Sequence, residues 1–264
     1  MFSLRGFVGA VFDFPFKAIH NKLGHSANTQ RIPAVVHQTW ETNSFGRRHR
    51  RSISDFRQVN PDLSFVLYDK NQRDDYMLQN WNHRLIHEIY SRAIYGTLKA
   101  DIFRYCVVHD LGGYYFDISK GTKSSITAMH DSDSVGLVSF ENNKIDGSPG
   151  GINILRPSNL IIQWGFGFAA GHEILLRQIE RMEGSFPEFV GKTFTSPKAA
   201  ILDFSGPISF TKTVHQFAKD KSLDTISQKD VDFAGEGIYS LWGSGARFLK
   251  YPSYAEAKNT GIFL

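Results

Sequence analysis

The chain has 264 residues, of which 41% are hydrophobic and 14% aromatic, with a formal net charge of +4 and a pI near 9.0. This composition excludes an intrinsically disordered protein and allows one α/β domain with a sizeable core. The mildly positive charge suits phosphorylated ligands or anionic lipid. Because the basic residues form no recognisable nucleic-acid-binding motif, we expect no nucleic-acid partner.

The single cysteine, Cys106, excludes an internal disulfide and a cysteine-rich metal site. It lies in an apolar helical pattern, which favours a small buried residue over a nucleophile. The lack of disulfides is typical of a reducing compartment, so we expect a cytoplasmic protein. The densest basic run, Arg47-Arg48-His49-Arg50-Arg51, is typical of a solvated helix face or loop. Contact of that run with phosphate or a membrane is the second interpretation.

Residues 1–27 form an amphipathic segment in which phenylalanines are interrupted by Arg5, Asp13, Pro15 and Lys17. The apolar run is too short and too charged to cross a bilayer, which needs about 20 apolar residues, and no signal-peptide cleavage site follows it. Two interpretations stay open: a segment lying in a membrane interface, and a helix packed on its own domain. The first makes the protein peripheral on the inner face of the cell membrane. Residues 28–264 are expected to form one domain.

Beyond the amphipathic segment, the hydrophobic pattern predicts alternating strands and helices. Strands are expected at 32–40, 63–68, 114–119, 134–140 and 152–155, and helical segments at 72–95, 98–110, 172–182 and 208–219. Gly112-Gly113 should end the second helical segment, as glycines do at helix C-termini. The alternation predicts an α/β fold with a mixed sheet.

The segment from Asp101 to Ser119 brings charged residues together. Asp101 and Arg104 are three residues apart and share one helical face. The helix from Asp101 to its glycine end rises ~15 Å, and the following strand travels back ~13 Å to Asp117. Asp117 should therefore return to the neighbourhood of Asp101 and Arg104. Asp117 and Ser119 should point to the same side of the strand.

Two interpretations of this cluster stay open on spacing alone. In the first, Asp101 and Arg104 hold sugar hydroxyls, because carboxylates accept several hydrogen bonds and arginine offers a rigid donor fork. Asp117 and Ser119 then face a diphosphate and its metal. In the second, Asp101 and Arg104 form a structural ion pair beside an ordinary aspartate at a strand end.

Two adjacent segments, Lys99–Tyr105 and Leu111–Ser119, resemble the signature of the DXD-containing sugar transferases. That family, similar to glycosyltransferase family 32, includes fungal Golgi mannosyltransferases, bacterial capsule and lipopolysaccharide transferases, and clostridial glucosylating toxins. The strand ending in His37-Gln38-Thr39-Trp40 and the sequence Ser205-Gly206-Pro207 are also similar to that family. In outline the resemblance covers residues 31–210.

The resemblance implies a GT-A-like single nucleotide-sugar-binding domain with a mixed, mainly parallel sheet flanked by helices. It implies a hexosyltransferase that uses a UDP- or GDP-sugar and retains the anomeric configuration. The acceptor is expected to be a glycan or lipid-linked glycan, in surface polysaccharide or lipopolysaccharide biosynthesis. Apart from the resemblance, the amphipathic segment at residues 1–27 makes a membrane surface a further expected partner.

The resemblance also assigns roles to individual residues. Trp40 is expected to stack on the nucleotide base, and Tyr115 to contact the nucleotide. Asp101 and Arg104 are expected to hold the donor sugar, and Asp117 is the first aspartate of the motif. These three charged residues are the candidate catalytic group.

The motif departs from the family at its third position, Ser119, where the family usually has a carboxylate that ligates Mn²⁺ or Mg²⁺. Asp117 and Ser119 are the candidate metal ligands, and the hydroxyl is the weaker one for a hard cation. Alternatively, Lys120 or Lys123 neutralises the leaving diphosphate without metal. A catalytically silent nucleotide-sugar-binding protein is the main alternative function.

A C-terminal loop, Leu241–Arg247, resembles the loop that closes over the diphosphate in the family. Its glycines permit close backbone approach to an anion. Ser244 and Arg247 are the candidate phosphate contacts.

Three further patterns have competing interpretations. Trp164–Ala170 has the spacing of a dinucleotide-binding fingerprint, which makes an NAD-dependent oxidoreductase a remote alternative. His83 and His87 are four apart, but the order of residues differs from that of zinc hydrolases and favours surface histidines. His37 is expected to hydrogen-bond within the fold.

Overall fold

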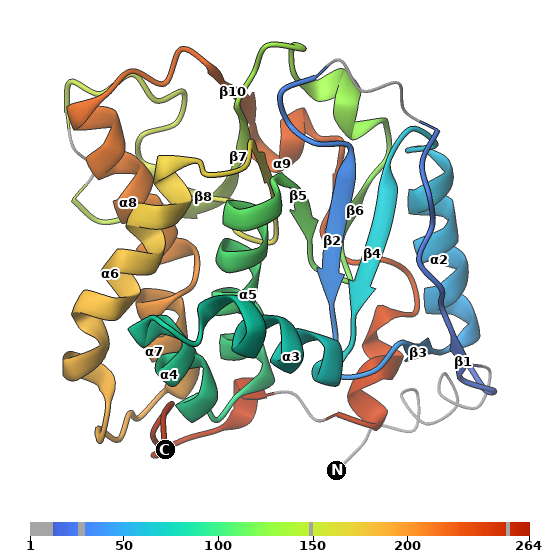
Figure 1. Ribbon diagram of the computed structural model, residues 1–264, viewed down its shortest axis with the longest axis horizontal. Coiled ribbons are helices and arrows are strands. Elements are labelled where there is room, and N and C mark those ends of the chain that lie inside the picture. The colour runs from blue at the N-terminus through green and yellow to red at the C-terminus, as the bar shows by residue number, and fades with distance from the viewer. Residues whose placement is uncertain (1–12, 26–29, 148–149, 252–253) are drawn as a thin grey trace.

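The computed structural model describes residues 13–25, 30–147, 150–251 and 254–264 (Figure 1). Its main feature is a seven-stranded sheet with the order β10-β7-β9-β5-β2-β4, in which β8 pairs with β7. The strands are β2 (Val35–Thr39), β4 (Ser64–Tyr68), β5 (Gly113–Phe116), β7 (Gly136–Lys144), β8 (Asn159–Ile161), β9 (Gly165–Phe168) and β10 (Ile226–Asp230).

The sheet is mixed but mainly parallel. β4, β2 and β5 pair in parallel, β9 runs antiparallel to both β5 and β7, and β10 is parallel to β7. β4, β2, β5, β7 and β10 therefore point one way, and β9 and β8 point the other. The expected α/β class with a mixed, mainly parallel sheet flanked by helices is confirmed.

Helices cover both faces of this sheet. One face packs on α3 (Lys70–Trp81), α4 (Leu85–Arg92), α5 (Gly96–Leu111), α6 (Glu173–Phe189), α7 (Pro197–Phe204) and α8 (Pro207–Asp220). The other face packs on α2 (Arg47–Gln58), the 3-10 helix η1 (Ile126–Met129) and α9 (Val231–Ala234). In Figure 1, α5 and α2 lie on opposite sides of β2 and β4. Tyr115 enters the first core and its neighbours Tyr114 and Phe116 the second, because strand side chains alternate between faces.

Short elements complete the fold. β1 (Lys17–Ala18) pairs with β3 (Ser44–Phe45), and β6 (Gly121–Thr122) pairs with β11 (Gly237–Ile238). Two 3-10 helices, η2 (Ser244–Leu249) and η3 (Tyr254–Glu256), lie near the C-terminus. Within the described ranges, no helix is long and apolar enough to cross a bilayer.

The hairpin of α5 and β5 forms as its spacing predicts. Gly112 and Gly113 both have positive φ (65° and 95°), the region that glycine enters without steric cost. A Cβ at Gly113 would lie 2.5 Å from the Val35 carbonyl oxygen, so only glycine fits against β2. His37 Nε2 also donates to the Gly112 carbonyl at 3.0 Å, which confirms its expected hydrogen bond within the fold. Burial lowers the pKa of His37 to about 4, so the ring is neutral.

The structure corrects the interpretation of Trp164–Ala170 as a dinucleotide-binding loop. Residues 165–168 are strand β9, inside the sheet between β5 and β7. Glycine is required at two positions of β9 because aromatic rings of the neighbouring strand β5 pack against the β9 backbone. A Cβ at Gly167 would lie 2.4 Å from Tyr114, and one at Gly165 would lie 2.8 Å from Phe116. The fingerprint on which the remote oxidoreductase alternative depended is therefore wrong.

Two other local expectations need correction. The strand expected at 152–155 is absent, and the strand that pairs with β7 is β8, a few residues later. The backbone at Leu155 instead donates to the Gln228 side chain, outside any strand ladder. His83 lies in the turn before α4, while His87 lies in that helix, so they share no helical face. The described residues contain no cluster of three or more His, Cys, Asp or Glu that could hold a metal.

The N-terminal segment is described only from residue 13 onward, so the expectation for residues 1–12 lies outside the described residues. Between residues 13 and 25 the chain runs along the domain. Lys22 Nζ donates to the carbonyls of Arg57 and Asn60 at 2.9 and 2.8 Å, at the end of α2. A positive charge at the C-terminal end of a helix interacts favourably with the helix dipole. The ammonium also hydrogen-bonds to carbonyl groups that have no partner within the helix.

Candidate functional site

The predicted convergence of Asp101, Arg104 and Asp117 is confirmed by their distances. Arg104 Nη2 lies 2.9 Å from Asp101 Oδ1 and 3.0 Å from Asp117 Oδ1. Arg104 Nη1 donates to the Gln163 carbonyl oxygen at 2.9 Å. One guanidinium therefore joins helix α5, the residue that follows strand β5 and the segment before β9.

Asp101 lies behind this arginine. Its side chain is buried, and its second oxygen accepts a hydrogen bond of 2.8 Å from the Ser205 hydroxyl. Burial raises the pKa of Asp101. Burial also acts to lower the pKa of Arg104, but Asp117, Tyr115 and Asp101 outweigh it and raise that pKa, so the guanidinium stays charged. Asp101 thus holds Arg104 in place rather than lining the cavity that Arg104 faces.

Asp117 lines that cavity, which has a volume of about 190 Å³. Its Oδ1 accepts a second hydrogen bond, from the Tyr115 hydroxyl at 3.1 Å. The Arg104 guanidinium stacks 4.6 Å from the Tyr115 ring centre. The Asp117 side chain is 31% exposed, so its other oxygen remains accessible to a ligand.

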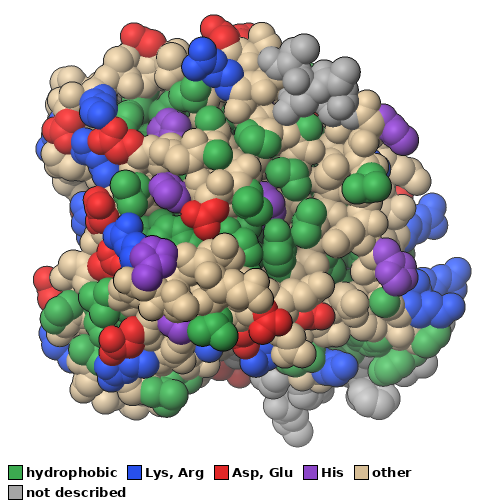
Figure 2. All heavy atoms as spheres, in the orientation of Figure 1, with side chains coloured by type: hydrophobic (Ala, Val, Ile, Leu, Met, Phe, Trp, Pro, Cys, Tyr) green, Lys and Arg blue, Asp and Glu red, His purple; other side chains and the backbone are tan. Residues whose placement is uncertain are grey.

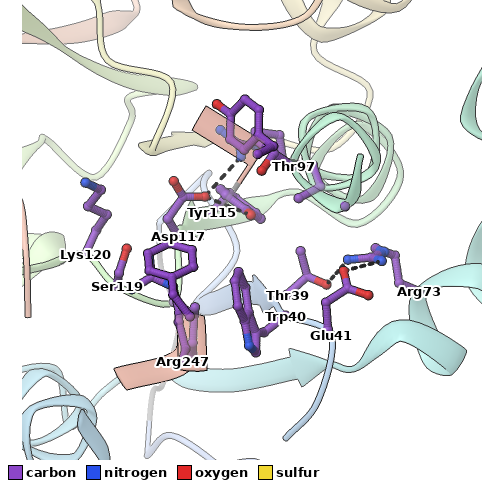
Figure 3. Close-up of a pocket in the computed structure, with 16 residues that line it drawn as sticks. Thr39, Trp40, Glu41, Arg73, Thr97, Tyr115, Asp117, Ser119, Lys120 and Arg247 are labelled. Carbon is purple, nitrogen blue, oxygen red and sulfur yellow. Dashed lines mark hydrogen bonds and ion pairs between the residues drawn. The ribbon is translucent and has the colours of Figure 1, made fainter. Parts of the chain in front are cut away.

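The cavity collects most of the candidate residues (Figure 3). Those that line it are Trp40, Arg104, Tyr115, Asp117, Ser119, Lys120 and Arg247. Figure 3 shows Ser119 and Lys120 on one side of Asp117, with Trp40 toward the opposite side. Ser244 does not line the cavity; it is buried, 3.2 Å from the Ser240 hydroxyl.

The structure distinguishes the two candidate lysines. The turn from Asp117 to Lys120 is closed by a 2.8 Å hydrogen bond between their backbones, which places Lys120 beside the aspartate. Its ammonium lies 3.3 Å from the centre of the Tyr239 ring and donates to the Tyr239 carbonyl at 2.6 Å. Burial lowers the pKa of Lys120. Lys123 instead donates to the Gly235 carbonyl and does not line the cavity.

Two parts of the site were missed by sequence reasoning. Arg73 is buried and holds Glu41 at 3.0 Å, and both line the cavity beside Trp40. His49 Nε2 donates at 2.9 Å to the carbonyl of Ile118, between Asp117 and Ser119. Burial lowers the pKa of His49 to about 4, so it is a neutral donor that fixes the motif. The helical spacing of the buried residues His49, Ile53 and Phe56 was the available signal for α2.

The central part of this site matches a known family. Residues 46–136 match the family described as a glycosyltransferase sugar-binding region containing a DXD motif. This part of the chain is therefore similar to the DXD-motif glycosyltransferases. The matching range includes Asp101, Arg104, Asp117, Ser119 and Lys120.

Individual proteins are similar over longer ranges. Inositol phosphoceramide mannosyltransferase 3 of Schizosaccharomyces pombe is 24% identical over 190 residues, covering 72% of this chain and 47% of that protein. A mannosyl phosphorylinositol ceramide synthase of Saccharomyces cerevisiae is 25% identical over 109 residues, covering 41% and 28%. The chain therefore spans less than half the length of these relatives. Among solved structures, PaToxG glycosyltransferase is similar with a TM-score of 0.48 and 14% identity, covering 74% and 72% of the two chains.

The family's DXD motif is incomplete as a metal site in this chain. A divalent cation in the cavity would meet one motif carboxylate, Asp117, whose Oδ1 already accepts from Arg104 and Tyr115. The second motif position offers the hydroxyl of Ser119. Mn²⁺ and Mg²⁺ require several oxygen ligands, preferably charged ones. The described donor set does not fit a cation held by the protein.

Trp40 should bind the base of a nucleotide from its position in the cavity wall. Its ring makes edge contacts with Phe248 and Tyr251, at 6.1 and 6.2 Å between centres, and Arg247 lies 5.1 Å from it. Replacing Trp40 by alanine should weaken binding of a nucleoside diphosphate by ~1–3 kcal/mol, the range for base–aromatic stacking. Calorimetry measures this affinity, and Trp242→Ala, an exposed tryptophan outside the cavity, is the matched control. Equal affinities in both variants would place the base elsewhere.

Proposed function

We propose that this chain is a hexosyltransferase that moves a sugar from a nucleoside diphosphate to a glycan or lipid-linked glycan acceptor. The observation that carries the proposal is the accessible carboxylate of Asp117. It is held by Arg104 and Tyr115 in a cavity that also presents an aromatic wall and further cations. Carboxylates and arginine suit sugar hydroxyls, aromatic rings suit a base, and cations suit a diphosphate.

The distribution of side chains suggests how a donor would lie. The base and ribose would occupy the side of Trp40 and Glu41, and the diphosphate would lie toward Ser119 and Lys120, as Figure 3 allows. The hexose would then meet Asp117 and Arg104, while Asp101 acts as a positioning residue through its ion pair with Arg104. Retention of the anomeric configuration belongs to the proposal through the family resemblance.

The experiment that tests the proposal is transfer of labelled hexose from UDP- and GDP-sugars to a panel of glycolipid and oligosaccharide acceptors. The expected result is a product whose formation releases one equivalent of nucleoside diphosphate. NMR of the product gives its anomeric configuration. A folded protein that binds a donor but forms no product with any acceptor would favour the catalytically silent alternative.

A lipid-linked acceptor is supported by a surface close to the cavity. The backbone N–H of Arg47 donates to the Asp13 carbonyl, so residue 13 lies against the N-terminus of α2. The Arg48 guanidinium lies 5.0 Å from the centre of the Trp242 ring, and Trp242 precedes cavity residue Arg247 by only five positions. We name the membrane face as Phe14, Arg47, Arg48, Arg51 and Trp242.

The membrane face combines exposed aromatic and basic groups. Phe14 and Trp242 are each 62% exposed, and Arg47 and Arg51 are exposed on α2. Figure 2 shows Lys and Arg side chains gathered along the edge of the molecule over α2. Aromatic rings and arginines together favour the interface of an anionic bilayer. We therefore propose a peripheral protein on the inner face of the cell membrane. A role in surface polysaccharide or lipopolysaccharide biosynthesis belongs to the proposal through the family resemblance.

Removing the aromatic groups of the membrane face should weaken vesicle binding. The double variant Phe14→Ser/Trp242→Ser should bind phosphatidylglycerol vesicles at least about tenfold more weakly, because each buried aromatic ring contributes about 1.5–3 kcal/mol. Sedimentation with vesicles measures this affinity. The matched control is Leu78→Ser/Leu155→Ser, which removes two leucines that are each 52% exposed elsewhere. If neither the wild type nor either variant binds these vesicles, the membrane face is wrong and a soluble acceptor is favoured.

A further inference from the structure

The cations that line the cavity differ in their partners. Arg104 is paired with Asp101 and Asp117, and Arg73 is paired with Glu41. Lys120 and Arg247 form no ion pair with a carboxylate of the described residues within 4.0 Å. They are the two cavity cations whose charge is available to a bound anion.

Both of these cations are held in position by other contacts. The Lys120 ammonium is fixed by the Tyr239 ring and carbonyl, and an ammonium has three N–H donors, of which that carbonyl takes one. Arg247 lies over the rings of Trp40 and Phe248, at 5.1 and 4.1 Å from their centres. Its Nη1 donates to the Ser244 carbonyl, while its Nε is buried without a hydrogen-bond partner in the described structure. Fixed charges of this kind stabilise a developing anion with little reorganisation.

The same side of the cavity lacks the second carboxylate of the DXD motif. The position after Asp117 and Ile118 is Ser119, and the next residue is Lys120. Arg104 already pairs with both Asp101 and Asp117, so another cation is needed to balance the charge of a bound diphosphate. A divalent metal has that role where the motif is complete. In this chain, the adjacent lysine brings its own positive charge to the same turn.

We infer that Lys120, together with Arg247, neutralises the leaving diphosphate in place of a metal ion held by the protein. The inference rests on the proposed function and specifies its chemistry. The bond between the anomeric carbon and the β-phosphate oxygen breaks, and its electron pair stays on that oxygen, where the two cations stabilise the charge. The acceptor hydroxyl forms the new bond to the anomeric carbon. Its proton passes to the departing phosphate oxygen or to water.

The test measures binding of UDP and GDP by calorimetry, in EDTA and in Mn²⁺, together with sugar transfer in both conditions. The wild type should bind a nucleoside diphosphate and transfer sugar equally well in EDTA and in Mn²⁺, within about twofold. Lys120→Met should weaken binding of the diphosphate at least about tenfold, and binding of the nucleoside monophosphate much less, because the lost contact is to the leaving phosphate. Lys123→Met is the matched control and should behave as the wild type.

Two results would overturn the inference. One is diphosphate binding by the wild type that disappears in EDTA and returns with Mn²⁺. The other is a Lys120→Met protein with wild-type diphosphate affinity. If Lys120→Met unfolds, Lys120→Gln keeps a polar side chain without the charge and gives the same comparison. Failure of the proposed function would give a different result from failure of this inference. The wild type would then bind neither UDP nor GDP, in EDTA or in Mn²⁺.

Discussion

Replacing Asp117 by asparagine should lower kcat/KM for sugar transfer at least about 100-fold, which corresponds to about 2.7 kcal/mol of transition-state stabilisation. Asparagine keeps the size of the side chain but removes the charge that accepts from Arg104 and Tyr115 at 3.0 and 3.1 Å. It also replaces one of the two carboxylate oxygens, which accept hydrogen bonds, by an amide nitrogen, which donates them. Charge-assisted hydrogen bonds of this kind are about twice as strong as neutral ones.

The control for this variant is Asp203→Asn. Asp203 is a half-exposed carboxylate on α7, paired with Lys212 at 2.7 Å. Its replacement should leave transfer unchanged, since exposed ion pairs contribute little. Steady-state kinetics of the two variants, with thermal unfolding to show that both are folded, makes the comparison. A folded Asp117→Asn protein that retains half of the wild-type rate would remove Asp117 from the catalytic group.

Replacing Arg104 by methionine should both stop transfer and destabilise the protein, by about 3–5 kcal/mol in the free energy of unfolding. The reason is the buried carboxylate of Asp101, whose described partners would be reduced to neutral groups such as the Ser205 hydroxyl. Urea unfolding measures the loss. The double variant Asp101→Asn/Arg104→Met should regain at least about 1 kcal/mol, because the unpaired charge is gone.

This destabilisation should depend on pH in a defined direction. Burial already raises the pKa of Asp101 above its unfolded value, and Arg104 acts to lower it. Without Arg104 the folded pKa rises further, so the folded variant binds a proton more readily than the unfolded chain. The stability difference from the wild type should therefore shrink as the pH falls from about 8 to about 5. A difference that stays constant or grows on acidification would show that Asp101 is not the source of the destabilisation.

The hairpin that forms the centre of the site was predictable because its geometry is local. Helix rise, strand rise and two glycines of positive φ determine where Asp117 returns, and the ion pairs of Arg104 confirm that position. This spacing alone could not decide whether the cluster has a sugar-binding or a structural role. The same contacts serve both, and only the exposed side of Asp117 and the cavity beside it favour the first.

Contacts between distant segments could not be read from the sequence. Arg73 and Glu41 are 32 positions apart, and Arg73 lies in a helix rich in charged residues, where one buried arginine gives no pattern. The contact of Arg247 with Trp40 depends on how the C-terminal segment returns to β2. In β9 the pattern was misleading for a physical reason, because glycines that make room for Tyr114 and Phe116 have the spacing of a phosphate-binding loop.

Calorimetric titration of the purified chain with UDP- and GDP-hexoses shows whether the cavity around Asp117 binds a nucleotide sugar. We predict that at least one donor binds with a stoichiometry of about one per chain and competes with its free nucleoside diphosphate. We also predict that Trp40→Ala and Asp117→Asn each weaken this binding, while Trp242→Ala and Asp203→Asn leave it unchanged. Absence of binding by every donor to the folded wild type, or equal affinities in all four variants, would show that this cavity is not a nucleotide-sugar site.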